Sequence, residues 1–267
     1  MTGRLALVTG ANRGIGFEVA RQLIEREWSV WVTARDPAKA EAAAEKLGRS
    51  ALPLALDVTD SQSIENAFCE VSAGSETIHI AFNIAGVVFG RGSLTGNAPL
   101  ADVDLQGFDD VWSTNTRGMF SSMKEEIPVM LGNEAWGRYG LKGVIINNAS
   151  VSAHGVFPGI GPYSVSKHGV LGLTRGAALD YGKDGLRIVL ISPGGVDTPM
   201  RRASIEAQGR DPDENPAPNV QHRTNTSEEM ADVVMYLASP NAPSSIHGTD
   251  IDVTMGMLTG PFAPPAA

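Results

Sequence analysis

The chain has 267 residues, with 30 acidic and 21 basic side chains and a formal net charge of −9. This acidic balance argues against nucleic acid or an anionic membrane surface as a partner. No apolar run reaches the roughly eighteen residues of a membrane span, and the first one begins too early to leave room for a signal peptide, so we expect a cytoplasmic protein without a membrane anchor.

Short apolar runs alternate with amphipathic segments over most of the chain. Strands are predicted near residues 4–8, 29–33, 51–55, 78–82, 142–148, 186–191 and 248–252. Helices are predicted near residues 15–26, 37–47, 61–72, 104–131, 162–182 and 227–238. This order predicts an α/β fold with one Rossmann-type domain over residues 1–260, in which a doubly wound parallel sheet of about seven strands carries helices on both faces.

Two segments depart from this alternation. Residues 199–226 include the polar, proline-bearing stretch 202–226, which lies inside the predicted domain. We expect a mobile lid over a substrate cleft, and a disordered linker is the alternative. Residues 261–267 form a Pro/Ala-rich tail.

Cysteine and histidine carry little of the chemistry. The single cysteine, Cys69, excludes an internal disulfide and is expected to be a core thiol on a helix face. The five histidines share no metal-ligand spacing, so we expect no metal site.

The first predicted strand runs directly into a glycine-rich turn, and a helical pattern follows. Strand, glycine turn and helix are the context of a dinucleotide-binding fingerprint, because the glycines let the backbone approach a pyrophosphate and the helix N-terminus offers free N–H groups to it. A glycine-rich loop that only joins two core elements is the alternative. The cofactor-binding candidates in this turn are Gly10, Asn12, Arg13, Gly14, Ile15 and Gly16.

Tyr163 and Lys167 stand four residues apart in a predicted helix, and Ser150 precedes the tyrosine by thirteen residues. Positions i and i+4 share a helix face, so the phenol and the ammonium can point at the same substrate. A nearby positive charge lowers the pKa of a phenol, which suits acid–base chemistry at a carbonyl or an alcohol. An incidental lysine one helical turn from a structural tyrosine is the alternative.

Together, the glycine turn, Ser150 and the Tyr–Lys pair resemble the short-chain dehydrogenase/reductase family, and the resemblance runs from about Arg4 to Met257. Asn115 resembles the family's helix asparagine, which implies a catalytic tetrad of Asn115, Ser150, Tyr163 and Lys167. Two positions, Ile84 and Val189, depart from asparagines of the family pattern.

The resemblance also implies roles for individual residues. Tyr163 exchanges a proton with the substrate oxygen, Ser150 hydrogen-bonds that oxygen, and Lys167 binds the nicotinamide ribose and lowers the pKa of the tyrosine. Asn115 supports a water that links Lys167 to solvent. The remaining implied cofactor-binding residues are Asp57 at the adenine, Val58, Asn83, Ala85, Gly86, Pro193, Gly194, Val196 and Thr198, with Tyr163 and Lys167.

The end of the second predicted strand bears on the choice of cofactor. Ala34 stands where NAD-using members usually carry an aspartate, Arg35 follows it, and Arg13 lies in the glycine turn. A guanidinium matches the oxygens of a 2′-phosphate, so we expect NADP(H) rather than NAD(H). Asp36 argues the other way, and solvated surface arginines are the alternative.

The expected function is hydride transfer between NADP(H) and a carbonyl or secondary alcohol, as in reduction of an apolar or aromatic ketone. An NADP(H)-binding sensor or scaffold without turnover is the alternative. A serine hydrolase built on Ser150 and His154 lacks a Gly-x-Ser-x-Gly elbow. The candidate substrate-pocket residues are Phe89, His154, Val156, Phe157 and Met200, and His154 can equally be a solvated loop residue.

Family members often associate through the helices that carry the equivalents of Asn115 and Tyr163. The second of these helices offers Val170, Leu171, Leu173 and Leu179, which is more apolar surface than one buried face needs. We therefore expect a homodimer or a homotetramer, with a small-molecule carbonyl or alcohol as the other partner.

Overall fold

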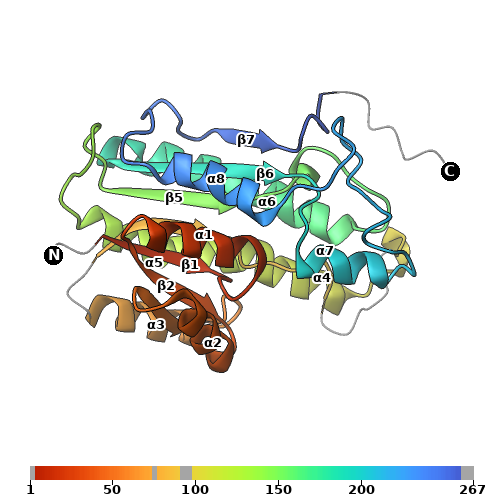
Figure 1. Cartoon of the computed structure of the whole chain (residues 1–267), viewed down its shortest axis with the longest axis horizontal. Helices are drawn as coiled ribbons and strands as arrows, with labels where there is room; N and C mark the ends of the chain where they lie inside the picture. The colour runs from red at the N-terminus through yellow and green to blue at the C-terminus, as the bar shows by residue number, and fades with distance from the viewer. Residues whose placement is uncertain (1–3, 74–76, 91–97, 260–267) are drawn as a thin grey trace.

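A computed structural model describes residues 4–73, 77–90 and 98–259, which fold around one parallel sheet (Figure 1). The sheet has seven strands in the order β3-β2-β1-β4-β5-β6-β7, and every neighbouring pair is parallel. The strands are β1 Leu5–Thr9, β2 Ser29–Ala34, β3 Ala51–Ala55, β4 Ile78–Asn83, β5 Gly143–Asn148, β6 Leu186–Pro193 and β7 Asp250–Val253. The predicted α/β fold with a seven-stranded parallel sheet is confirmed.

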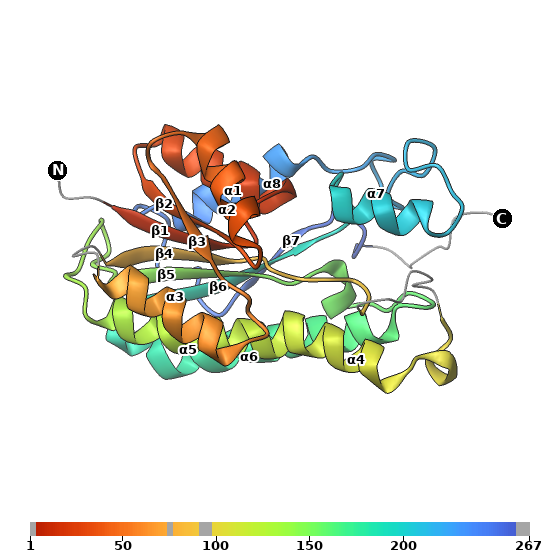
Figure 2. The same ribbon diagram turned by 90° about the horizontal axis from the view of Figure 1, so that it is seen from below.

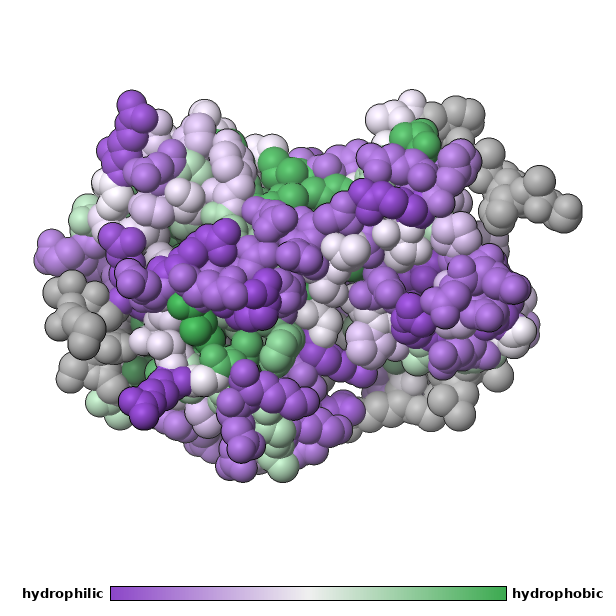
Figure 3. Space-filling view, viewed as in Figure 1, coloured by the Kyte–Doolittle hydropathy of each residue, from purple (hydrophilic) through white to green (hydrophobic). Residues whose placement is uncertain are grey.

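Helices cover both faces of the sheet (Figure 2). One face packs against α1 (Gly14–Glu25), α2 (Pro37–Leu47) and α8 (Ser227–Ala238), and the other against α3 (Ser61–Ala73), α5 (Gly118–Leu131) and α6 (Gly161–Tyr181). The central strands are buried on both faces, which explains why they are continuous apolar runs. The outer face of the α1–α2–α8 layer is mostly hydrophilic (Figure 3).

Two shorter helices, α4 (Leu105–Trp112) and α7 (Pro199–Glu206), lie beyond the carboxyl ends of the strands (Figures 1 and 2). Thr198 caps α7, and its hydroxyl accepts a hydrogen bond from the backbone N–H of Arg201. The segment predicted as a mobile lid therefore begins with an ordered helical turn, followed by an irregular stretch up to α8. No described helix is long and apolar enough to cross a membrane.

The helix predicted over residues 104–131 is interrupted by a π-helical turn, Ser113–Arg117, between α4 and α5. A π-turn inserts one extra residue into a helix and is frequent at functional sites. Here it buries Asn115 and Thr116 against α6, where the Thr116 hydroxyl donates to the carbonyl of Ser166.

One expectation about a single side chain was wrong. Cys69 is exposed, because the buried stripe of α3 consists of Ile64, Ala67, Phe68 and Val71, and position 69 lies off that stripe. Of the apolar residues named on α6, Val170 is fully buried and Leu179 is exposed.

A buried polar network crosses the layer between the sheet and helices α5 and α6. The Asn83 amide donates to Glu126 Oε2 at 2.9 Å and to Asn147 Oδ1 at 3.1 Å, and the Asn147 amide donates to Thr174 Oγ1 at 3.0 Å. Glu126 is fully buried, and this burial raises the pKa of its carboxyl group from 4.5 to about 7. Protonated Glu126 is thus part of the folded core at acidic pH.

The raised pKa predicts how Glu126→Gln changes stability with pH. Because the folded-state pKa exceeds the unfolded value, the contribution of Glu126 to the free energy of unfolding is fully present below about pH 4.5 and is lost as pH rises through about 7. Glutamine is neutral at every pH. The difference in unfolding free energy between the variant and wild type should therefore shift by roughly 2–3 kcal/mol in favour of the variant from pH 5 to pH 8. Urea denaturation at both pH values measures this, with Glu125→Gln on the same helix as control. An equal pH dependence in wild type and Glu126→Gln would contradict the assignment.

Candidate active site

A cavity of about 910 Å³ opens at the carboxyl ends of the strands. Its walls come from the β1–α1 turn, from the segments that follow β2, β3, β4, β5 and β6, and from α6 and α7. Strand order reverses between β1 and β4, and ligands of open α/β sheets bind at such a switch point. The topology therefore places the cavity where a nucleotide would bind.

The glycine turn forms one end of the cavity. Gly10 and Gly14 have φ angles of +66° and +57°, and a Cβ on Gly16 would lie 2.6 Å from the carbonyl oxygen of Gly10. These positions accept no side chain without strain. Helix α1 begins without a side-chain cap, so its first N–H groups stay available to an anion in the cavity. The turn therefore fits the pyrophosphate of a dinucleotide.

Ser150, Tyr163 and Lys167 meet in the same cavity. Ser150 follows β5, and its hydroxyl is hydrogen-bonded to that of Tyr163. Lys167 lies one turn further along α6, where its ammonium donates to the carbonyl of Asn148 at 2.8 Å and lies 5.6 Å from the centre of the Tyr163 ring. The structure thus brings together three of the four predicted catalytic residues.

Burial dominates the acid–base properties of this group. It raises the pKa of Tyr163, and the hydrogen bond with Ser150 opposes the rise only in part. It lowers the pKa of Lys167 to about 8. The expectation that Lys167 lowers the pKa of Tyr163 stays a prediction, because the causes of the shift are burial and the Ser150 hydrogen bond.

Asn115 does not line the cavity. Its side-chain carbonyl accepts from Val87 N at 2.8 Å, and its amide donates to Val87 O at 2.8 Å and to Ser166 Oγ at 2.9 Å. Ser166 in turn donates to the carbonyl of Tyr163. Both amide hydrogens are donated within the protein, and the expectation that Asn115 supports a water stays a prediction. The residue links the segment after β4 to α6.

Asn83 was expected at the cofactor, but it lies beneath the cavity floor. Its amide donates hydrogen bonds to Glu126 and Asn147 in the buried network, and the residue is 2% exposed. The other predicted cofactor residues from β4 and β6 line the cavity, namely Ala85, Gly86, Pro193, Gly194, Val196 and Thr198.

Of the five predicted substrate residues, the cavity is lined by Phe157 and Met200 and not by Phe89, His154 or Val156. Val156 is 72% exposed, because the chain turns outward between the short helix after Ser150 and α6. His154 is not a free loop residue, since its Nε2 contacts Asp250 Oδ2. It therefore ties the segment after β5 to the edge strand β7.

The opposite end of the cavity carries three basic side chains, Arg13, Arg35 and Lys39. Asp36, which argued for NAD(H), caps α2 by accepting from Ala38 N at 3.1 Å and lies 3.7 Å from the Lys39 ammonium. The sequence reasoning missed Lys39, although its position three residues after Asp36 on a helix was a usable signal.

Asp57 and Val58 also line this end of the cavity. One oxygen of Asp57 accepts from the N–H and the hydroxyl of Thr59 at 2.9 and 2.7 Å, while Asp60 accepts from Gln62 N at the start of α3. The helix cap is therefore Asp60, and Asp57 remains at the cavity.

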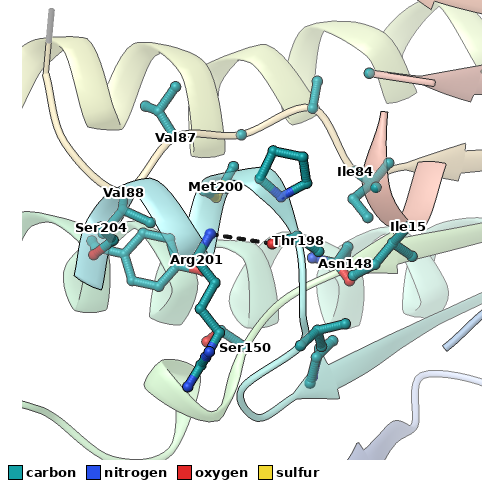
Figure 4. Close-up of a pocket in the computed structure, with 18 of the residues that line it drawn as sticks. Ile15, Ile84, Val87, Val88, Asn148, Ser150, Thr198, Met200, Arg201 and Ser204 are labelled. Atoms are coloured by element: carbon teal, nitrogen blue, oxygen red, sulfur yellow. Dashed lines mark hydrogen bonds between the residues drawn. The ribbon is translucent and has the colours of Figure 1, made fainter. Parts of the chain in front are cut away.

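Helix α7 forms one wall of the cavity, where Met200, Arg201 and Ser204 lie (Figure 4), and residues after the helix continue this wall within the segment that was predicted to be a lid. This wall is part apolar and part basic. Its lining residues missed from the sequence are Arg201, Ser204, Ile205, Gln208, Arg210, Ala217 and Pro218. The amphipathic pattern of residues 199–206 was too short to indicate which of its arginines faces inward.

The topology, the glycine turn and the cavity define a nucleotide-binding α/β protein of the Rossmann type. Residues 10–258 match the family model described as enoyl-(acyl carrier protein) reductase. The chain belongs to the short-chain dehydrogenase/reductase family of oxidoreductases.

Among its relatives, the A-factor type gamma-butyrolactone 1'-reductase (1S-forming) of Streptomyces virginiae is 34% identical, over 96% of this chain and 96% of the relative. The 3-oxoacyl-(acyl-carrier-protein) reductase of Vibrio harveyi is 32% identical, over 96% of this chain and 98% of the relative. Among solved structures, levodione reductase has a TM-score of 0.84 at 27% identity and covers 97% of this chain and 99% of its own. The 3-ketoacyl-(acyl-carrier-protein) reductase of Brucella melitensis complexed with NADH has a TM-score of 0.82 at 27% identity, with coverage of 95% and 98%.

Proposed function

We propose that this protein is an NADP(H)-dependent oxidoreductase that interconverts a carbonyl and a secondary alcohol. The observation that carries the proposal is the meeting of Ser150, Tyr163 and Lys167 in a cavity whose other end is the glycine turn. When bound, the nicotinamide would supply or accept the hydride. Family membership and the names of the relatives support the reaction class.

Tyr163 acts as the proton donor in this proposal. Its raised pKa keeps the hydroxyl protonated at neutral pH, which suits carbonyl reduction. Ser150 donates to the same substrate oxygen and stabilises the charge that develops there. Lys167 binds the nicotinamide ribose, and its charged form favours the phenolate left after proton transfer.

Asn115 acts as a positioning residue. It fixes Val87 on one side and Ser166 on the other, so it sets the distance between the segment after β4 and the helix that carries Tyr163 and Lys167. A buried amide that satisfies three hydrogen bonds holds such a distance with little freedom.

The preference for NADP(H) rests on charge at the β2 end of the cavity. Arg13, Arg35 and Lys39 would hold the 2′-phosphate, and Ala34 offers no carboxylate to a ribose 2′-hydroxyl. Asp36 is engaged as the cap of α2. NAD(H), the cofactor of the similar Brucella structure, is the other outcome of the test.

The substrate is proposed to be a ketone with an apolar or aromatic part. Phe157, Ile160, Met200, Ile205 and Met257 line the cavity. Relatives named for alicyclic substrates, such as the (-)-isopiperitenol/(-)-carveol dehydrogenase of Mentha piperita at 31% identity, are consistent with such a lining. A sensor or scaffold without turnover would have no use for a Ser–Tyr–Lys group in the cavity, so we place it second.

Tyr163→Phe tests the proton donor. The substitution removes the hydroxyl and keeps the ring, so turnover should fall about a hundred- to ten-thousandfold while NADPH affinity stays nearly unchanged. Steady-state reduction of a ketone panel and fluorescence titration with NADPH measure the two effects. Tyr181→Phe, at the end of the same helix, is the matched control. Retention of more than about a tenth of the activity would refute Tyr163 as the donor.

Arg35→Ala tests the cofactor preference. One charge-assisted contact to a phosphate contributes roughly 1.5–3 kcal/mol, so the KM for NADPH should rise about ten- to a hundredfold while that for NADH hardly changes. Ala34→Asp should shift the preference further toward NADH. The measurement is kcat/KM with both cofactors, and Arg49→Ala, exposed and outside the cavity lining, is the control. The assignment fails if wild type prefers NADH or if Arg35→Ala keeps its full preference.

A homodimer or homotetramer is proposed from the outer surface of α4, α5 and α6. Leu105, Trp112, Phe120, Val165 and Leu179 are exposed there, and large apolar side chains on neighbouring helices are seldom left in water. Light scattering at micromolar concentration should give a multiple of the 28.1 kDa chain mass. A monomeric mass would exclude the proposed contact.

A further inference from the structure

We propose that the physiological substrate carries an acidic group, a carboxylate or a related anion, which Arg201 and Arg210 bind on the α7 wall of the cavity. This inference rests on the proposed function and specifies its substrate class. The two guanidinium groups line the same cavity as Ser150 and Tyr163.

Arg201 reaches the part of the cavity beside the proposed nicotinamide position. Its Nε lies 3.4 Å from the place where a Cβ on Gly195 would be. Gly195 follows Pro193 and Gly194 directly, in the turn after β6. The same Cβ would lie only 2.6 Å from the Cβ of Ala217, so glycine at this position lets Ala217 approach the turn, and the Arg201 side chain packs beside it.

Arg201 forms no ion pair with a carboxylate in the described part of the chain, although Asp197 is near enough to raise its pKa. Its one hydrogen bond from the guanidinium goes to the backbone carbonyl of Asn215. Its neighbour Arg202 has two acidic partners, Asp197 at 2.7 Å and Asp213 at 2.9 Å. Arg202 is thus paired at the surface, whereas the guanidinium of its neighbour Arg201 lines the cavity without an ion pair to a described residue.

Arg210 brings a second positive charge to the same wall. It contacts the side-chain oxygen of Asn215, so a single residue orients both guanidinium groups. Neither arginine forms an ion pair with any described residue. Burial lowers the pKa of Arg201, the nearby Asp197 opposes this shift, and the positive charges of Arg202 and Arg210 add to it, while the guanidinium itself stays protonated.

The cofactor's own phosphates do not account for this pair. The pyrophosphate is expected at the glycine turn and the N-terminus of α1, and the basic residues near a 2′-phosphate are Arg13, Arg35 and Lys39. Arg201 instead lies by Gly195, next to the reacting end of the cavity. In a protein of net charge −9, a local pair of cations is what an anionic substrate needs to enter.

Matched pairs of ketones test the inference. The holoenzyme with NADPH is assayed on benzoylformate, 3-benzoylpropionate and 4-benzoylbutyrate, which vary the distance from carbonyl to carboxylate, and on the methyl ester of each. Wild type should reduce at least one acid with a kcat/KM about tenfold or more above that of its ester. Arg201→Gln should abolish this preference mainly through KM and leave the esters within about twofold, and Arg201→Lys should restore part of it. Arg202→Gln is the control that should change nothing.

A binding measurement separates this inference from the proposed function. Calorimetric titration with 4-phenylbutyrate and with phenylphosphonate should show binding to wild type and to Arg202→Gln. The affinity of Arg201→Gln and of Arg210→Gln for the same ligands should be about tenfold or more weaker. The ligand that binds more strongly identifies the class of anion. Arg201-dependent binding without reduction of any ketone would refute the proposed function and keep the anion site. Reduction of esters and acids alike, with no anion binding, would overturn the inference and keep the function.

Discussion

The site depends on the fixed position of Asn115. The π-turn between α4 and α5 carries this side chain inward, where it holds both backbone groups of Val87 and the hydroxyl of Ser166. Ser166 lies between Tyr163 and Lys167 and donates to the carbonyl of Tyr163. One buried amide therefore sets how far the helix of the proposed acid stands from the cavity wall after β4. Without the extra residue of the π-turn, a regular helix would point this side chain elsewhere.

Burial shifts the pKa values of Tyr163 and Lys167 in opposite directions, and both shifts suit the proposed reaction. Desolvation penalises charge, so it raises the pKa of the Tyr163 phenol and lowers that of the Lys167 ammonium to about 8. In the proposed reaction the phenol keeps its proton until a substrate oxygen accepts it, and the amine is held by the carbonyl of Asn148. The same physics acts on Glu126 beneath the cavity, where a carboxyl group with a pKa of about 7 completes the buried network.

Basic side chains line the cavity in two separate regions. Arg13, Arg35 and Lys39 lie at the β2 end, the uncapped start of α1 follows, and Arg201 and Arg210 lie on the α7 wall. The rest of the lining combines apolar residues, among them Phe157 and Met200, with the polar group of Ser150, Tyr163 and Lys167. A long ligand with anionic groups at separate points and an apolar part near Tyr163 fits this arrangement better than a small neutral molecule does.

The sequence by itself determined the strand and helix order, the glycine turn and the spacing of Ser150, Tyr163 and Lys167, because these are local patterns of apolar periodicity, backbone freedom and helical repeat. It did not determine which polar side chains face the cavity. Asn83 and Asn115 are turned into buried networks, His154 is held by Asp250 on a strand distant in sequence, and Arg201 and Arg202 differ only through the carboxylates that α7 meets. Those outcomes depend on contacts between segments far apart in the chain, and only the tertiary structure decided them.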